Sequence, residues 1–202
     1  MTQRELLFHL LFLVILLVLG AIRLWYYREQ RRALALKKQE TLNDLRQIAA
    51  MIACLVIVTH IINPDLLSWT EFALPEWTRW VGVALASLAV GASWVAARDE
   101  IFVYRQTVSK TFDPPGSFRL VRHPLELALV SVAMGLTLLS ANWLVALIGG
   151  TWATHEVVVR APRVERERHA RMGEAYTAYA RVTPSFVPGF SRSFSRDTRR
   201  DE

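Results

Sequence analysis

The chain has 202 residues, of which 52% are hydrophobic, and its 24 Lys and Arg residues outnumber its 18 Asp and Glu residues. This apolar content exceeds that of an average soluble domain. Because several apolar runs approach the roughly 20 residues that cross a hydrocarbon core, we interpret the basic excess as membrane topology and not as nucleic-acid binding. Cys54 is the single cysteine, which excludes an internal disulfide and a metal site built from several cysteines.

Three apolar runs in the first half of the chain predict membrane helices: Leu6 to Ile22, Gln47 to Ile62 and Val81 to Ala97. Arginines follow the first run directly, beginning at Arg23. A cleaved signal peptide carries its basic residues in front of the apolar run, so this order favours an uncleaved helix with its N-terminus outside. The linker 23–46 holds seven basic residues, and we expect it on the cytoplasmic side.

An uncharged run of 28 residues, Leu127 to Thr154, is too long for one crossing. As a straight helix with a rise of 1.5 Å per residue it would extend about 42 Å, well beyond a core of about 30 Å. Ser140-Ala141-Asn142 near its middle predicts a turn, so we expect a helical hairpin. The chain then has about five spans, with the N-terminus outside, the C-terminus cytoplasmic and 22 of the 24 Lys and Arg residues inside.

Ionisable residues directly precede this hairpin, between Gly116 and Glu126. Arg119, Arg122 and His123 come just before Pro124, a residue suited to the first turn of a helix, and Glu126 lies within that turn. The pattern places these side chains at a bilayer surface. It fits either a functional site or an ordinary basic flank of a membrane helix, and spacing alone leaves both open.

The polar tail from Arg163 to Arg181 has helical spacing. One stripe of this helix holds Glu165, His169, Met172, Tyr176 and Tyr179, and another holds Glu167, Arg171 and Glu174. We expect the first stripe to face the membrane helices. A carboxylate on such a face is costly unless it binds something, so Glu165 is a better site candidate than Glu167. The alternative is that Glu165 only pairs with an arginine from the loop before Pro124. Residues 189–202 have the composition of a disordered tail.

These motifs, taken in order, carry a resemblance. The set is Gly116-x-Phe118-Arg119-x-Val121-Arg122-His123-Pro124, a hydrophobic hairpin, Glu165, Gly173, Tyr176, Tyr179 and Val182-Thr183-Pro184. It resembles the isoprenylcysteine carboxyl methyltransferase family and its phospholipid methyltransferase relatives. The resemblance covers about residues 108–188 and leaves 1–107 as a region of three N-terminal spans. Two positions depart from the family pattern, Glu126 in place of a tyrosine and Val164 in place of a glutamate.

The resemblance implies an all-α polytopic membrane protein with an amphipathic cytoplasmic tail helix. It implies an enzyme, expected in a bacterial cytoplasmic membrane, that transfers a methyl group from S-adenosyl-L-methionine to a lipophilic acceptor at the cytoplasmic face. The acceptor is a carboxylate, a thiol or an amine, and neither a metal nor a nucleic acid takes part. Catalytic roles fall to Arg122 and His123, and a substrate role to Glu126. The residues expected at the cofactor are Arg119, His123, Glu165, His169, Tyr176 and Tyr179.

Two alternatives remain at this point. A non-catalytic membrane protein with a degenerate methyltransferase fold would explain the departures at Glu126 and Val164. A membrane sterol-type reductase that uses a nicotinamide cofactor has a similar helical end, but the Asn-Tyr pair expected after the proline is not found here.

Overall fold

The computed structural model describes residues 3–34, 56–60, 63–109 and 113–186, and in these residues the regular structure is helical. Four helices form the body of the protein: α1 (Gln3–Leu34), α3 (Glu76–Ser109), α4 (Pro124–Ser140) and α5 (Trp143–His155). A π-helical turn (Glu156–Arg160) joins α5 to α6 (Ala161–Met172), and α7 (Glu174–Val182) follows. Short 3-10 turns cover Pro64–Thr70 and Gly116–Arg119. The all-α prediction is confirmed for this part of the chain.

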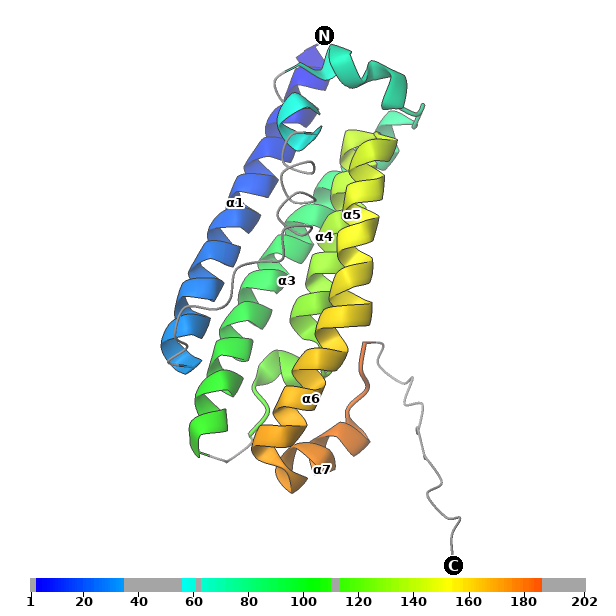
Figure 1. Ribbon diagram of the computed structural model, residues 1–202. Coiled ribbons are helices and arrows are strands. Elements are labelled where there is room, and N and C mark those ends of the chain that lie inside the picture. The colour runs from blue at the N-terminus through cyan, green and yellow to red at the C-terminus, as the bar shows by residue number, and fades with distance from the viewer. Residues whose placement is uncertain (1–2, 35–55, 61–62, 110–112, 187–202) are drawn as a thin grey trace, which may run out of the picture.

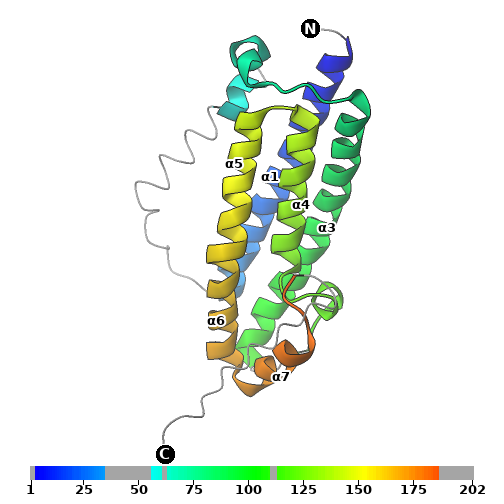
Figure 2. The same cartoon turned by 90° about the vertical axis from the view of Figure 1, so that its right-hand side faces the viewer.

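The four long helices run side by side as an elongated bundle (Figures 1 and 2). Helix α3 packs against α1 and α4, and α4 packs against α5. Helix α6 extends the line of α5 past the start of α4 and lies beside the last part of α3, and α7 folds back across that end (Figures 1 and 2). The bundle therefore has one end capped by α6, α7 and the loop before α4.

Two helices in the described residues are long and apolar enough to cross a membrane, Gln3–Arg32 and Glu76–Gln106. Helix α4 is also apolar but has only 17 residues. The predicted span Gln47 to Ile62 falls mostly outside the described residues, as does the tail 189–202. Membrane-spanning character is thus supported for the first and third predicted spans.

Helix α1 buries one face against the bundle. Phe8, Phe12, Ile15, Leu19, Ile22 and Tyr26 recur at alternating spacings of four and three and are all buried. The opposite face is equally apolar but exposed, as at Leu10 and Leu17. A helix that is hydrophobic all round requires an apolar surrounding on its outer face as well as its inner one.

Helices α3 and α4 approach each other closely through small residues. A Cβ atom built on Gly82 would lie 2.6 Å from Leu139 N, and one built on Gly135 would lie 2.6 Å from Ala86 N. Only glycine lets the two backbones come this near. This contact fixes the end of α4 against the first part of α3.

The predicted hairpin turn is confirmed at residues 140–142. Helix α4 ends at Ser140, and Ala141 adopts a left-handed conformation with φ 49°. Asn142 caps α5, since its Oδ1 accepts from Leu144 N (3.0 Å) and Val145 N (3.3 Å). Its Nδ2 also donates to Thr70 Oγ1 (2.5 Å), which ties the turn to the 3-10 segment beside it.

The expected single tail helix is wrong in one respect. Gly173 has φ 56° and separates α6 from α7, because a positive φ ends a helix and favours glycine. The predicted inward stripe is nevertheless buried where Met172, Tyr176 and Tyr179 pack with Val103 and Phe118. Glu167, Arg171 and Glu174 are exposed, as expected for the outward stripe.

Candidate functional site

The Arg122-His123-Pro124 segment starts helix α4 at the capped end of the bundle. Pro124 is the first helical residue, and His123 occupies the N-cap position without a side-chain cap hydrogen bond. The backbone N–H groups of Arg122 and His123 donate instead to the carbonyls of Pro184 (2.8 Å) and Ser185 (3.2 Å). The segment that follows α7 therefore accepts hydrogen bonds from the backbone N–H groups of the two residues that precede the first turn of α4.

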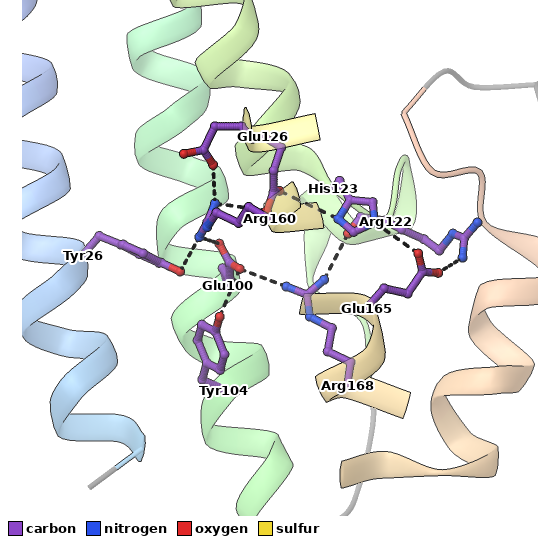
Figure 3. Close-up of polar contacts among 10 residues, drawn as sticks. Tyr26, Glu100, Tyr104, Arg122, His123, Glu126, Arg160, Glu165 and Arg168 are labelled. Carbon is purple, nitrogen blue, oxygen red and sulfur yellow. Dashed lines mark hydrogen bonds and ion pairs between the residues drawn. The ribbon is translucent and has the colours of Figure 1, made fainter. Parts of the chain in front are cut away.

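Glu165 of α6 faces this segment, so residues from two distant parts of the chain meet. The Arg122 guanidinium contacts the Glu165 carboxylate and also donates to Ser185 Oγ (2.6 Å). His123 Nε2 lies 3.6 Å from Glu165 Oε2 (Figure 3). The Glu165 side chain is 24% exposed, which leaves it accessible to a ligand from solution.

Neighbouring groups favour the ionised form of Glu165. The neighbouring His123 imidazole and the positive charge of Arg122 hold the pKa of this carboxyl below its ordinary 4.5, although partial burial opposes them. At neutral pH the site thus presents a carboxylate that can accept hydrogen bonds from hydroxyl groups or face a cation.

His123 is buried between two carboxylates. Its side chain is 2% exposed, and Nδ1 lies 3.9 Å from Glu126 Oε2 while Nε2 faces Glu165. Within the part of the chain that the structure describes, Nδ1 makes no hydrogen bond. Phe186 stacks on the imidazole with ring centroids 5.1 Å apart.

The remaining predicted cofactor residues lie at different depths. Tyr179 donates its hydroxyl to the Phe118 carbonyl (2.7 Å), and Tyr176 is buried beside it. His169 packs edge-on against Tyr176 with ring centroids 4.7 Å apart. Burial raises the pKa of both tyrosines, so both are neutral phenols. Arg119 is exposed, and its Nε donates to Pro114 O (3.2 Å) in the same loop. This contact directs the Arg119 side chain toward its own loop.

A buried ionic network behind His123 was missed by sequence reasoning. Its centre is Arg160 on the π-helical turn, which donates to Glu126 (3.1 Å), Glu156 (3.0 Å) and the Tyr26 hydroxyl (3.0 Å). Figure 3 shows Arg160 between Glu126 of α4 and Tyr26 of α1. Glu126, expected as a substrate residue, is therefore an anchored and almost fully buried carboxylate.

A second buried pair joins α3 to α6. Arg168 donates to Glu100 Oε1 (3.0 Å) and to the Arg122 carbonyl (3.2 Å). The Tyr104 hydroxyl also faces Glu100 (3.5 Å). Burial disfavours the charge of Arg168, but the Glu100 carboxylate more than offsets it and raises the pKa of the guanidinium. Arg168 thus links the network to the backbone of the predicted site.

For one residue of the buried ionic network, Glu100, the sequence does indicate burial. Glu100 lies at helical spacing from Ala96, Ala97 and Tyr104, all of which are buried. An acid that continues an apolar stripe must be buried or paired. The sequence gives no such indication for Arg160, because the direction of its side chain depends on the π-helical turn.

The structure brings together Arg122, His123, Glu165 and Glu126, and it places the tyrosines next to them. In the described residues no group of three or more His, Cys, Asp and Glu side chains could hold a metal ion. The chemistry available here is that of a paired carboxylate, an imidazole and arginine donors at the end of an apolar bundle.

No protein-family model matches this chain, and no curated protein matches it either. Family membership is therefore not shown, and the resemblance rests on the motif residues themselves.

The residues present fit S-adenosylmethionine in their chemistry. Glu165 is an accessible, ionised carboxylate suited to ribose hydroxyls, and the buried Nε of Arg122 makes no hydrogen bond within the described residues. Tyr176 and Tyr179 supply aromatic faces, to which a sulfonium is attracted as other cations are. These groups are the ones that would hold the cofactor.

Proposed function

We propose that this protein is a membrane methyltransferase that uses S-adenosylmethionine to methylate a lipophilic acceptor. The observation that carries the proposal is the meeting of Arg122 and His123 at the start of α4 with Glu165 of α6. These residues lie at the end of a bundle whose outer faces are apolar. A soluble cofactor and a membrane-dissolved acceptor meet at such a boundary.

Each group has a role that its surroundings support. Glu165 accepts hydrogen bonds from the cofactor ribose, Arg122 binds its carboxylate, and Tyr176 and Tyr179 supply aromatic side chains next to them. When bound, the cofactor supplies an activated methyl group on a positively charged sulfur. Methyl transfer is an in-line displacement, so the protein contributes mainly alignment and the exclusion of water.

The proposed topology has the N-terminus outside and the site on the cytoplasmic side. Trp69, Trp77 and Trp80 are exposed at the opposite end of the bundle from the site, where an aromatic belt suits the outer interface. Among the residues that the structure describes, most arginines lie in the half of the bundle that carries the site, as expected for the cytoplasmic face.

A non-catalytic role is the second candidate, and one observation favours it. Arg122 and Glu165 pair with each other, and Arg122 is further held by Ser185. These contacts would also serve simply to fasten α6 and the segment after α7 to the start of α4. A protein in which the contacts of Arg122 with Glu165 and Ser185 are purely structural would bind no cofactor.

Cofactor binding separates these candidates. The purified full chain in detergent is titrated with S-adenosylhomocysteine, with NADPH as the control for a nicotinamide enzyme. Saturable binding of S-adenosylhomocysteine alone is the expected result. Binding of NADPH alone would replace the proposal with a reductase, and the absence of binding to both would favour the non-catalytic role.

A further inference from the structure

The two ring nitrogens of His123 face two carboxylates that differ in their exposure to solvent. Nε2 faces Glu165, whose side chain is 24% exposed, and Nδ1 faces Glu126, whose side chain is 2% exposed. The imidazole therefore lies between the solvent-accessible side of the site and its buried side. An imidazole in this position can take a proton at one nitrogen and release one from the other.

The buried side of this arrangement is held rigidly. Glu126 is fixed by Arg160, which is itself fixed by Glu156 and the Tyr26 hydroxyl. On the ring face, Phe186 stacks against the imidazole. His123 Nδ1 is buried and makes no hydrogen bond within the described residues, so its capacity to accept a proton is unused there.

The arginines at this site already face carboxylates. Arg122 pairs with Glu165, Arg168 with Glu100, and Arg160 with Glu126, Glu156 and Glu100. Arg23 also faces Glu156 (3.5 Å). An anionic acceptor at Nδ1 would bring another negative charge beside Glu126 without a matching cation among these four arginines. A neutral acceptor that carries a proton meets no such penalty.

We propose that His123 is the general base of this site and that the acceptor is a lipophilic thiol or amine, which loses a proton on methylation. This inference rests on the proposed methyltransferase function. The attacking sulfur or nitrogen forms its bond to the methyl carbon as the carbon–sulfur bond of the donor breaks, with that electron pair left on the donor sulfur. The acceptor proton moves to His123 Nδ1, and the Nε2 proton passes to Glu165 and then to water.

In this arrangement His123 is a catalytic residue, and Glu126 and Arg160 are positioning residues that orient it. The separations of 3.6 and 3.9 Å exceed hydrogen-bond length. Catalytic contacts are often long without ligands and shorten in the reacting complex. A carboxylate acceptor, in contrast, is already ionised at neutral pH and has no proton for His123 to take.

An acceptor panel tests the substrate class on the unaltered protein. Methyl-labelled S-adenosylmethionine is supplied to the full chain in detergent with decanethiol, decylamine or decanoate. We expect label in the thiol or the amine, and the labelled compound identifies which. Label in decanoate alone would overturn the inference and leave the proposed function intact, whereas failure to bind S-adenosylhomocysteine would remove both.

A pH series tests the role of the base. His123→Asn should lower transfer to the preferred acceptor about a hundredfold at pH 7. Transfer should recover as the pH rises above the acceptor's own pKa, because the acceptor then needs no base. Glu167→Gln, an exposed change on the same helix as Glu165, should leave transfer unchanged. An equal loss from His123→Asn at every pH would mean that His123 is only structural.

A ligand-free measurement tests the relay without any activity. In protein labelled with ¹⁵N-histidine, the ring signals of His123 are assigned by their loss in His123→Asn. Glu126→Gln should shift mainly the Nδ1 signal, Glu165→Gln mainly the Nε2 signal, and Glu167→Gln neither. Ring signals that stay unchanged in both Glu126→Gln and Glu165→Gln would refute the placement of His123 between the two carboxylates.

Discussion

Arg168 of α6 donates a 3.0 Å hydrogen bond to Glu100 of α3, and both side chains are almost fully buried. The same guanidinium donates to the backbone carbonyl of Arg122. A charge that is removed from water in this way is tolerated only with its partner in place. The pair therefore couples the stability of the fold to the position of the predicted site.

Loss of one member of this pair should be costly. Arg168→Met removes the nearer of two arginines that face Glu100, since Arg160 lies 3.8 Å from its carboxylate, and we expect the free energy of unfolding to fall by about 3–5 kcal/mol. Denaturant unfolding in detergent micelles measures this. Arg171→Met, an exposed change on the same helix, should change stability by less than about 0.5 kcal/mol. The double variant Glu100→Gln/Arg168→Met should be more stable than Arg168→Met alone, and a lower stability would contradict the pairing.

Glu165 should be the acid on α6 that matters for cofactor binding. We expect Glu165→Gln to weaken S-adenosylhomocysteine binding at least tenfold, or about 1.4 kcal/mol, because a neutral amide replaces an accessible carboxylate. The matched change Glu167→Gln removes an exposed acid two residues away and should have no effect. Calorimetric titration of both variants checks this, and equal losses of affinity would refute the assignment.

The ionised Glu165 carboxylate should also make the stability of the fold depend on pH. Since the pKa of Glu165 is held below its ordinary 4.5 in the folded protein, the folded state favours the carboxylate. Its contribution is complete above the unfolded pKa and is lost as the pH falls through the folded pKa. The difference in melting temperature between the parent and Glu165→Gln should be constant from pH 7 to 5 and shrink below pH 4.5. A difference that grows on acidification would mean that the pKa is raised instead.

The close approach of α3 and α4 should tolerate no added methyl group. Gly135→Ala places a Cβ 2.6 Å from Ala86 N, and forcing the helices apart costs about 1–3 kcal/mol. Gly150→Ala on α5 is the matched control, because its Cβ meets nothing within 4 Å. Thermal unfolding should show a lower melting temperature for the first variant and an equal or higher one for the second, since alanine favours helix. A neutral Gly135→Ala would contradict the packing.

The C-terminus should lie on the cytoplasmic side. A reporter that is active only in the cytoplasm, fused after Glu202, should be active, and one that is active only outside should be silent. The reason is the concentration of Lys and Arg in the sequence segments 23–46, 98–122 and 160–200. The opposite result would place the proposed cofactor site on the outer face of the membrane and would contradict the proposed topology.

Much of the architecture was predictable from local rules. The hairpin followed from the length of the uncharged run, and Asn142 occupies the turn because its side chain caps α5. The meeting of Arg122 with Glu165 followed from helical periodicity in the tail together with that hairpin. Both predictions depend on apolar length and spacing, which a sequence displays directly.

The buried ionic network was not predictable in the same way. Arg160 and Arg168 were counted with the basic residues that set topology, because surface and buried arginines look alike in sequence. Their burial depends on the direction that the Arg160 side chain takes from the π-helical turn and the Arg168 side chain from α6, and tertiary packing against α1 and α3 sets these directions. The break at Gly173 was missed because the apolar spacing continues across it.

The π-helical turn at Glu156–Arg160 sets the rotational register between α5 and α6. A residue occupies about 100° of an α-helix, so removing one residue within this turn would rotate α6 by roughly that angle while leaving the hairpin as it is. Glu165 and Arg168 would then point away from Arg122 and Glu100. A chain that lacks one residue of this π-helical turn would keep the helical bundle, but it could not form the pairs Arg122–Glu165 and Glu100–Arg168 from the same positions of α6.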